Sequence, residues 1–194
     1  MRKRLLLWFF CSLSLFLYTF SSLQLINAQI PGSKTYFDPG HKFSFTYPLN
    51  WQVKGSHDNI TGSSQVILSK PNSTRTQVSI LYNPNDSLLF NTKTGKPIVL
   101  PKALTSLEKQ ISTDYIFFNA TGKFPHKYTI QNHQSASDIV NYEKSAGKPG
   151  KMLIVLAKAN DKDSCTVIYS ESKRLFYKNL PNVSEIIKSI QITS

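Results

Sequence analysis

The sequence of 194 residues is poor in cysteine, glycine and acidic residues. One of its two cysteines, Cys11, lies in an apolar leader, so the rest of the chain cannot form an intrachain disulfide. The eight glycines form neither a Gly-rich phosphate loop nor a G-x-S-x-G nucleophile turn. The 11 acidic residues offer few paired carboxylates for acid–base catalysis. These absences predict a protein that is not an enzyme.

Metal ligands are not grouped in the sequence either. His126 and His133 are seven residues apart around a predicted strand, which would place them on opposite faces. His57 has one acidic neighbour and no third ligand nearby. The segment Asn160–Asp163 begins like a calcium loop, but a lysine interrupts it and the later Gly and Glu are missing, so a turn is favoured. We expect no metal ion and no cofactor.

The first 28 residues have the pattern of a secretory signal peptide. A basic tip (residues 2–4) precedes an uncharged apolar run from Leu5 to Phe20, and Ala28 provides a small residue at a cleavage point. This run is shorter than the roughly 20 residues that cross a bilayer, which favours cleavage. The alternative is an uncleaved anchor over residues 5–26. In both cases residues 29–194 are predicted to lie outside the cytoplasm, either secreted or membrane-anchored.

The chain is strongly basic, with a net charge of +12. Three of the 23 basic residues and none of the acidic ones lie in the leader, so the remainder carries +9. Such a surface favours an unknown protein or an anionic cell-surface component as partner. Outside the leader the basic residues are scattered, and Lys173-Arg174 is the longest run, so nucleic-acid binding is not expected. Membrane contact is expected only through an uncleaved leader.

Five N-x-Ser/Thr sequences are present. In an exported chain these are candidate N-glycosylation sites, and we expect four of them, in predicted loops, to be available: Asn59, Asn72, Asn85 and Asn119. The fifth, Asn182, is followed three residues later by Glu185, the pattern of a helix N-cap. A capping side chain binds backbone amides, so Asn182 is expected to stay unmodified.

Apolar patterning predicts a sheet. Phe43, Phe45 and Tyr47 alternate with polar residues, whereas Met152–Ala157 is continuously apolar, as in a strand buried on both faces. Cys165 lies in another apolar run and is expected to be a buried, unreactive thiol. The predicted strands are His41–Tyr47, Gln65–Ser69, Thr76–Tyr82, Tyr128–Gln131, Ala136–Glu143, Met152–Ala157 and Thr166–Ser170, with Tyr115–Phe118 as a further strand entering the core.

Two helices and a long loop complete the pattern. One helix begins near Pro101 and has an apolar face, with Glu108 and Lys109 pointing outward; the other ends the chain. Their apolar positions are Leu104, Leu107 and Ile111 in the first, and Val183, Ile186, Ile187 and Ile190 in the second. Residues 83–97 form a polar loop that carries three apolar residues, which either fold back over the sheet or contact a partner: Leu88, Leu89 and Phe90.

Three segments in this order resemble the PsbP-type domain, known from extrinsic subunits of photosystem II. They are the strand and turn Phe43–Trp51, the helix Leu104–Ile111, and Phe176–Pro181 followed by Ile186–Ile190. The resemblance spans residues 36–192 and implies an α+β fold, an α/β/α sandwich with a central antiparallel sheet, shared with a Ran-binding nuclear-import factor family. It implies core positions for Phe43, Phe45, Tyr47, Trp51, Ile186 and Ile190, and it transfers no functional residue.

The leader pattern and the resemblance together give the expected organisation: a signal peptide or anchor at 1–28, a linker at 29–35 and a PsbP-like domain at 36–194. The N-terminal extension by which photosystem subunits hold their complex is missing, so the chain is more similar to secreted PsbP-related proteins of non-photosynthetic microbes. We expect an exported, non-enzymatic binding or accessory module at the cell exterior. The alternatives are a carrier of a small ligand or metal ion and, third, a hydrolase whose residues meet only in the fold.

Overall fold

The computed structural model describes residues 32–71, 73, 75–121 and 128–193. The chain divides into two units, residues 1–31 and 32–194, and the second contains all of the described residues. The predicted leader, Asn72 and His126 lie outside the described residues. Within the described part of the chain, no helix is long and apolar enough to span a membrane.

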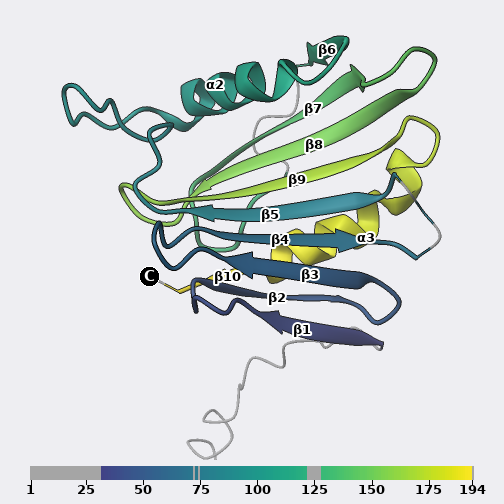
Figure 1. The fold of residues 1–194 in the computed structure, drawn as a ribbon, viewed down its shortest axis with the longest axis horizontal. Coiled ribbons are helices and arrows are strands. Elements are labelled where there is room, and N and C mark those ends of the chain that lie inside the picture. Colours follow the sequence, from purple (N-terminus) through teal and green to yellow (C-terminus); the bar gives the residue numbers. More distant parts are fainter. Residues whose placement is uncertain (1–31, 72, 74, 122–127, 194) are drawn as a thin grey trace, which may run out of the picture. The chain divides into compact units, whose positions relative to one another are not determined.

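The described residues form two antiparallel sheets and two helices (Figure 1). One sheet has seven strands in the order β3-β4-β5-β9-β8-β7-β6, and the other has three in the order β1-β2-β10. The strands are β1 (Ser33–Phe37), β2 (Phe43–Pro48), β3 (Gln52–His57), β4 (Ser64–Ser69), β5 (Gln77–Asn83), β6 (Phe117–Ala120), β7 (Ser135–Glu143), β8 (Pro149–Lys158), β9 (Ser164–Ser172) and β10 (Gln191–Ile192). The helices are α2 (Leu100–Ser112) and α3 (Phe176–Ser189).

The helices cover opposite faces of the large sheet. Helix α2 contacts β6, β7 and β8, whereas α3 contacts β8, β9 and the small-sheet strand β2. Side chains of β8 therefore alternate between two cores: Leu153 and Val155 belong to the cluster with α3, and Ile154 and Leu156 to the cluster with α2. The predicted fold class, α+β with an α/β/α sandwich and a central antiparallel sheet, is confirmed.

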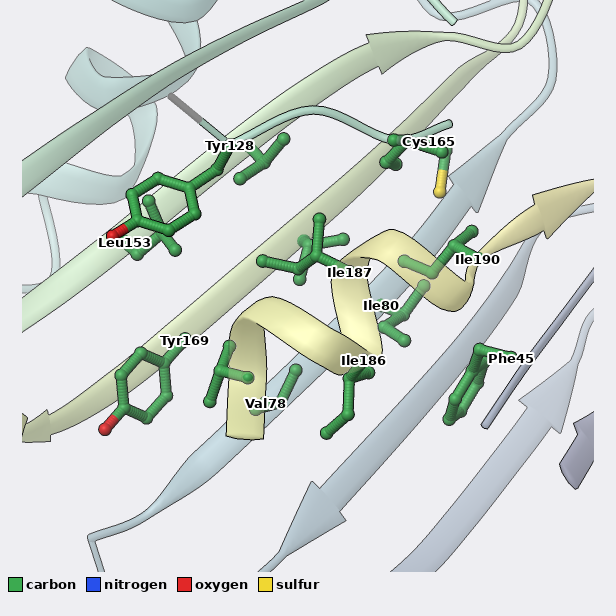
Figure 2. Close-up of a cluster of buried hydrophobic side chains, with 14 of the residues drawn as sticks. Phe45, Val78, Ile80, Tyr128, Leu153, Cys165, Tyr169, Ile186, Ile187 and Ile190 are labelled. Carbon is green, nitrogen blue, oxygen red and sulfur yellow. The ribbon is translucent and has the colours of Figure 1, made fainter. Parts of the chain in front are cut away.

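The core under α3 is built from the apolar stripe predicted for the end of the chain. Ile186 and Ile187 pack against Val78 and Tyr169 of the sheet (Figure 2). Complete burial of each such aliphatic side chain contributes roughly 1.5–3 kcal/mol. Cys165 is buried in the same cluster, as predicted, and burial raises the pKa of its thiol to about 12.

Some predicted boundaries differ from the structure. Strand β3 was not predicted because its residues are mostly polar, and it lies at an edge of the large sheet where one neighbour, β4, suffices. Strand β1 begins at Ser33, within the segment expected to be a linker. The predicted strand Tyr128–Gln131 is irregular chain, although Tyr128 and Ile130 are buried as a strand would bury them.

Helix α3 begins seven residues before the predicted start of the apolar stripe. The N-cap predicted at Asn182 is therefore wrong, because this residue is exposed in the interior of the helix. Pro181 also lies inside α3, where proline usually ends a helix, and this is why the earlier turns were missed. The burial of Phe176, Asn179 and Leu180 against the sheet supports these turns.

The segment after α2 does not enter the core as predicted. Ile116 is 73% exposed and Phe117 50% exposed, and β6 is the free edge of the large sheet. Asn119 is exposed on this strand rather than in a loop. Tyr115 and Phe118 alone of the predicted run pack partly against the cluster under α2.

Candidate functional site

A pocket of about 400 Å³ opens on the α2 face of the large sheet. It lies at the end of the sheet where the β4–β5 and β7–β8 turns project (Figure 1). Strands β5, β9, β8 and β7 provide its floor. The described residues that line it are Arg75, Gln77, Ser79, Tyr115, Tyr142, Lys144, Ser145, Lys148, Pro149, Gly150, Met152, Ile168, Ser170 and Ser172.

The charged side chains of the pocket are all basic. Arg75 comes from the β4–β5 turn, and Lys144 and Lys148 come from the β7–β8 turn. These three residues are exposed, and none of the described lining residues is acidic. Neighbouring Glu171 is only 1% exposed and lies on the opposite face of β9 from Ser170 and Ser172, where it accepts hydrogen bonds from Asn179 and Thr76. It is therefore behind the floor and is not one of the lining residues. The pocket therefore attracts anions.

The floor of the pocket carries hydroxyl groups on alternate strand positions. Ser170 and Ser172 are two residues apart on β9 and so lie on the same face. On β5, Gln77 and Ser79 have the same spacing, and the Gln77 amide donates to the Ser79 hydroxyl at 3.1 Å. A floor of this kind offers both donors and acceptors to a ligand.

Two tyrosines form one wall. The rings of Tyr115 and Tyr142 meet edge to face with centroids 4.9 Å apart. Burial, the largest cause, and the charge of Glu171 raise the pKa of Tyr142, while a hydrogen bond with Ser170 and the charge of Arg75 act in the opposite direction. The Tyr142 ring lies over its cross-strand partner Gly150, where a Cβ atom would be 2.4 Å from the tyrosine Cζ. Glycine is thus required at this position for the wall to form.

A buried pair of carboxyl groups lies elsewhere on the α2 face. Glu108 was predicted to point outward, but it follows Leu104 by four residues and lies on the same buried side of α2, 9% exposed. Burial first, and then Asp138 of β7 through its charge and a hydrogen bond, raises the pKa of Glu108 to about 7. Asp138 also accepts a hydrogen bond from Thr121 at 3.0 Å. Near neutral pH the Glu108 carboxyl is therefore partly protonated.

Asp38, Ser64 and His57 come together at the junction of the two sheets. The Ser64 hydroxyl donates to the Asp38 carboxylate at 3.0 Å and lies 2.8 Å from His57 Nδ1. In a nucleophilic triad the imidazole lies between hydroxyl and carboxylate, whereas here the hydroxyl lies between the other two. Ser64 and Asp38 are both buried, so this network links β4 to the β1–β2 turn.

The predicted glycosylation and metal residues are separate from the pocket. Asn59 and Asn85 are exposed in turns. His133 Nδ1 lies 2.9 Å from the Lys158 carbonyl oxygen. The described residues contain no group of three or more His, Cys, Asp or Glu that could hold a metal ion. The segment Asn160–Asp163 was considered as a calcium loop. In the structure the Asn160 side chain accepts hydrogen bonds from the backbone amides of Lys162 and Asp163, as in a turn.

The three apolar loop residues assigned as candidate partner contacts lie near α2. Leu89 is 0% exposed and belongs to the cluster under this helix. Of the two alternatives, it therefore folds back over the sheet, and its side chain is not available to a partner. Leu88 and Phe90 are half-buried against the same cluster. The loop is held by hydrogen bonds from Asp86 N to the Lys162 carbonyl and from Ile98 N to the Leu89 carbonyl.

The basic pocket was missed from the sequence. Arg75 is about 70 residues from the two lysines in the sequence. The strand order β5-β9-β8-β7 brings the three residues to the same end of the large sheet. The available signal was weak: serines at alternate positions of otherwise apolar strands, and lysines in the Gly147 turn.

The sequence matches no protein-family model, and a search of curated proteins finds no significant match. Solved structures are similar in fold. They include cyanobacterial PsbP (CyanoP) of Synechocystis, with a TM-score of 0.53 and 11% identity over 86% of this chain and 96% of that one. LpqN of Mycobacterium tuberculosis has a TM-score of 0.52 and 12% identity over 84% of this chain and 91% of that one.

The Ran-binding protein Mog1p of Saccharomyces cerevisiae is also similar, with a TM-score of 0.52 and 7% identity over 82% of this chain and 95% of that one. At these identities the likeness concerns the fold and not the activity. The large antiparallel sheet and a helix on each of its faces agree with the resemblance drawn from the sequence. The chain has the PsbP-like fold.

Proposed function

We propose that this chain is an exported, non-enzymatic binding module that takes up an anionic partner at the cell exterior through the basic pocket. The observation that carries the proposal is the gathering of Arg75, Lys144 and Lys148 around a polar pocket with no acidic residue among its described lining. Three cations of like charge repel one another, and an anion placed between them relieves that repulsion.

Several features support export and a role at the envelope. The leader has the pattern of a secretory signal, and the sequons at Asn59, Asn85 and Asn119 are on the surface. LpqN, which has a similar fold, is described as involved in cell envelope biogenesis. An envelope is rich in fixed anionic groups, which are the partners that a basic pocket selects.

A second candidate function is the carriage of a small apolar ligand. A pocket of about 590 Å³ lies at the start of α2, on the same face of the sheet, and its apolar lining includes Ile98, Leu100 and Ala136. Val99 also lines this pocket and is an exposed apolar residue. We rank this function second because the described lining of this pocket carries one cation, Lys158, whereas the basic pocket carries three, and a strongly basic surface favours an anionic partner.

The proposal is tested by measuring retention of a salt-eluted envelope partner, or of a defined polyanion such as heparin, on the immobilised protein. The variant R75Q/K144Q/K148Q is expected to lose binding at low salt. The matched control K93Q/K96Q/K109Q removes the same charge from exposed positions in the 83–97 loop and on α2. Equal retention of both variants would show that net charge alone binds the anion, and would overturn the pocket as the site.

A further inference from the structure

From the arrangement of the pocket we infer that its ligand is an anionic saccharide, that is, a sugar carrying a carboxylate, phosphate or sulfate group. This inference rests on the proposed function and specifies the class of ligand. Three kinds of group in the pocket each match one part of such a ligand. They are the basic rim, the hydroxyl-bearing floor and the tyrosine wall.

The rim is suited to the charged group. Arg75 presents a planar fork of donors that fits a carboxylate, phosphate or sulfate with two parallel hydrogen bonds. Lys144 and Lys148 lie on the β7–β8 turn and add two point charges. The rim alone would accept any small anion, so it sets the charge of the ligand but not the class.

The floor distinguishes a sugar from a bare anion. Phosphate and carboxylate groups only accept hydrogen bonds from the protein, and the rim already supplies donors. Ser79, Ser170 and Ser172 carry hydroxyls, and Gln77 carries an amide, so each can both donate and accept. A ligand that uses both the donor and the acceptor function of these groups needs donors of its own as well as acceptors. Saccharides have hydroxyls around the whole ring, whereas pyrophosphate and acidic peptides do not.

The wall offers an apolar surface in a fixed position. Tyr142 is held between Tyr115, at 4.9 Å, and the bare backbone of Gly150, so its ring is placed before a ligand arrives. A preformed contact surface reduces the ordering cost of binding. The C–H faces of a pyranose ring are apolar and pack against such a wall, which gives the third match. The pocket volume of about 400 Å³ also suits a short saccharide.

The experiment is calorimetric titration of the purified protein with five probes. Trigalacturonate and a heparin-derived tetrasaccharide are anionic saccharides that carry carboxylate and sulfate respectively. Fully methyl-esterified trigalacturonate removes the charge, while pyrophosphate and decaglutamate keep charge without sugar hydroxyls. We expect one or both anionic saccharides to bind at least tenfold more tightly than the other three probes. The tighter of the two identifies the charged group.

Variants separate the rim from the floor. S79A/S170A is expected to weaken saccharide binding about fivefold to tenfold and to leave the weak pyrophosphate binding unchanged. The control S56A changes an exposed strand serine of β3 outside the pocket and is expected to bind as the wild type does. R75Q is expected to weaken binding of every anionic probe. Thermal unfolding of each variant shows that the fold is intact.

The outcomes separate this inference from the proposed function. If pyrophosphate or decaglutamate binds as tightly as the saccharides and R75Q/K144Q/K148Q abolishes that binding, the saccharide inference is overturned and the anion-binding function stands. If S79A/S170A weakens the binding of pyrophosphate and of the saccharide equally, the floor does not bind sugar hydroxyls selectively, and the inference is again overturned. If no anionic probe binds, both fail.

Discussion

The two faces of the large sheet are covered in different ways. Under α3 the core is large and apolar, and its buried acid, Glu171, accepts hydrogen bonds from Asn179, Thr76 and Ser172. Under α2 the cluster is smaller, two carboxyl groups share a buried site, and the sheet is open at the basic pocket. The comparison indicates that the α3 face supplies most of the stability, and the proposed function places ligand binding on the α2 face.

Truncation of one buried residue on each face is expected to have the largest effect on the free energy of unfolding. Ile187→Ala on the α3 face and Leu104→Ala on the α2 face each remove a large buried side chain, and such changes cost about 2–5 kcal/mol. We expect Ile187→Ala at the upper end of this range, because its cavity lies in the larger core, and Leu104→Ala at the lower end. Urea unfolding of both variants measures the two costs. A larger cost for Leu104→Ala would contradict the assignment of stability to the α3 face.

The carboxyl pair under α2 should make stability depend on pH. The folded state raises the pKa of Glu108 from 4.5 to about 7, so it holds the proton more tightly than the unfolded chain does. The stabilisation is complete below pH 4.5 and is lost as the pH rises to about 7, by about 3 kcal/mol from this group. Unfolding free energies measured across this window should therefore decrease with pH.

Glu108→Gln should remove that decrease, because the amide stays neutral at every pH. The matched control Glu185→Gln changes an exposed residue of α3 that pairs with Lys188, and it is expected to keep the wild-type pH profile. If Glu108→Gln retains the full pH dependence, the dependence does not arise from Glu108.

The contact between Tyr142 and Gly150 gives a smaller effect. Gly150→Ala places a Cβ atom against the tyrosine ring, and overpacking of this kind costs about 1–3 kcal/mol. In a Tyr142→Ala background the same change should cost much less, because the nearest atoms to the added Cβ all belong to Tyr142. A double-mutant cycle measures this coupling. Additive costs would show that the ring does not depend on the glycine.

The pocket cations should contribute least to stability. Arg75, Lys144 and Lys148 are exposed and cover no core, so R75Q/K144Q/K148Q is expected to change the free energy of unfolding by less than about 0.5 kcal/mol. Thermal unfolding in low and high salt measures the change. A small gain at low salt would agree with relief of repulsion, whereas a loss above 1 kcal/mol would show that these residues support the fold.

The sequence predicted the α3 face better than the α2 face, for a physical reason. The end of the chain carries apolar residues at helical spacing, namely Val183, Ile186 and Ile187. Such a pattern indicates which face of a helix is buried. Glu108 was placed outside because it is charged, although its spacing from Leu104 puts it on the buried side. Acidic residues are seldom buried, and Glu108 is an exception because burial and the neighbouring Asp138 favour its uncharged form.

The pocket itself was beyond prediction because it depends on which strands are neighbours. Gln77 and Ser170 are 93 residues apart in the sequence, and they lie opposite each other only because β5 pairs with β9. Edge strands such as β3 were missed for a related reason. With one neighbour and a polar face, their residues carry no apolar alternation that could reveal them.

The most direct test of the difference between the faces is a backbone NMR titration with trigalacturonate and the heparin-derived tetrasaccharide. The account predicts that amide shifts change around Arg75, Ser79, Lys144–Gly150 and Ser170, and that α3 is unaffected. Shift changes centred on α3, or spread evenly over all basic residues, would contradict the assignment of binding to the pocket on the α2 face.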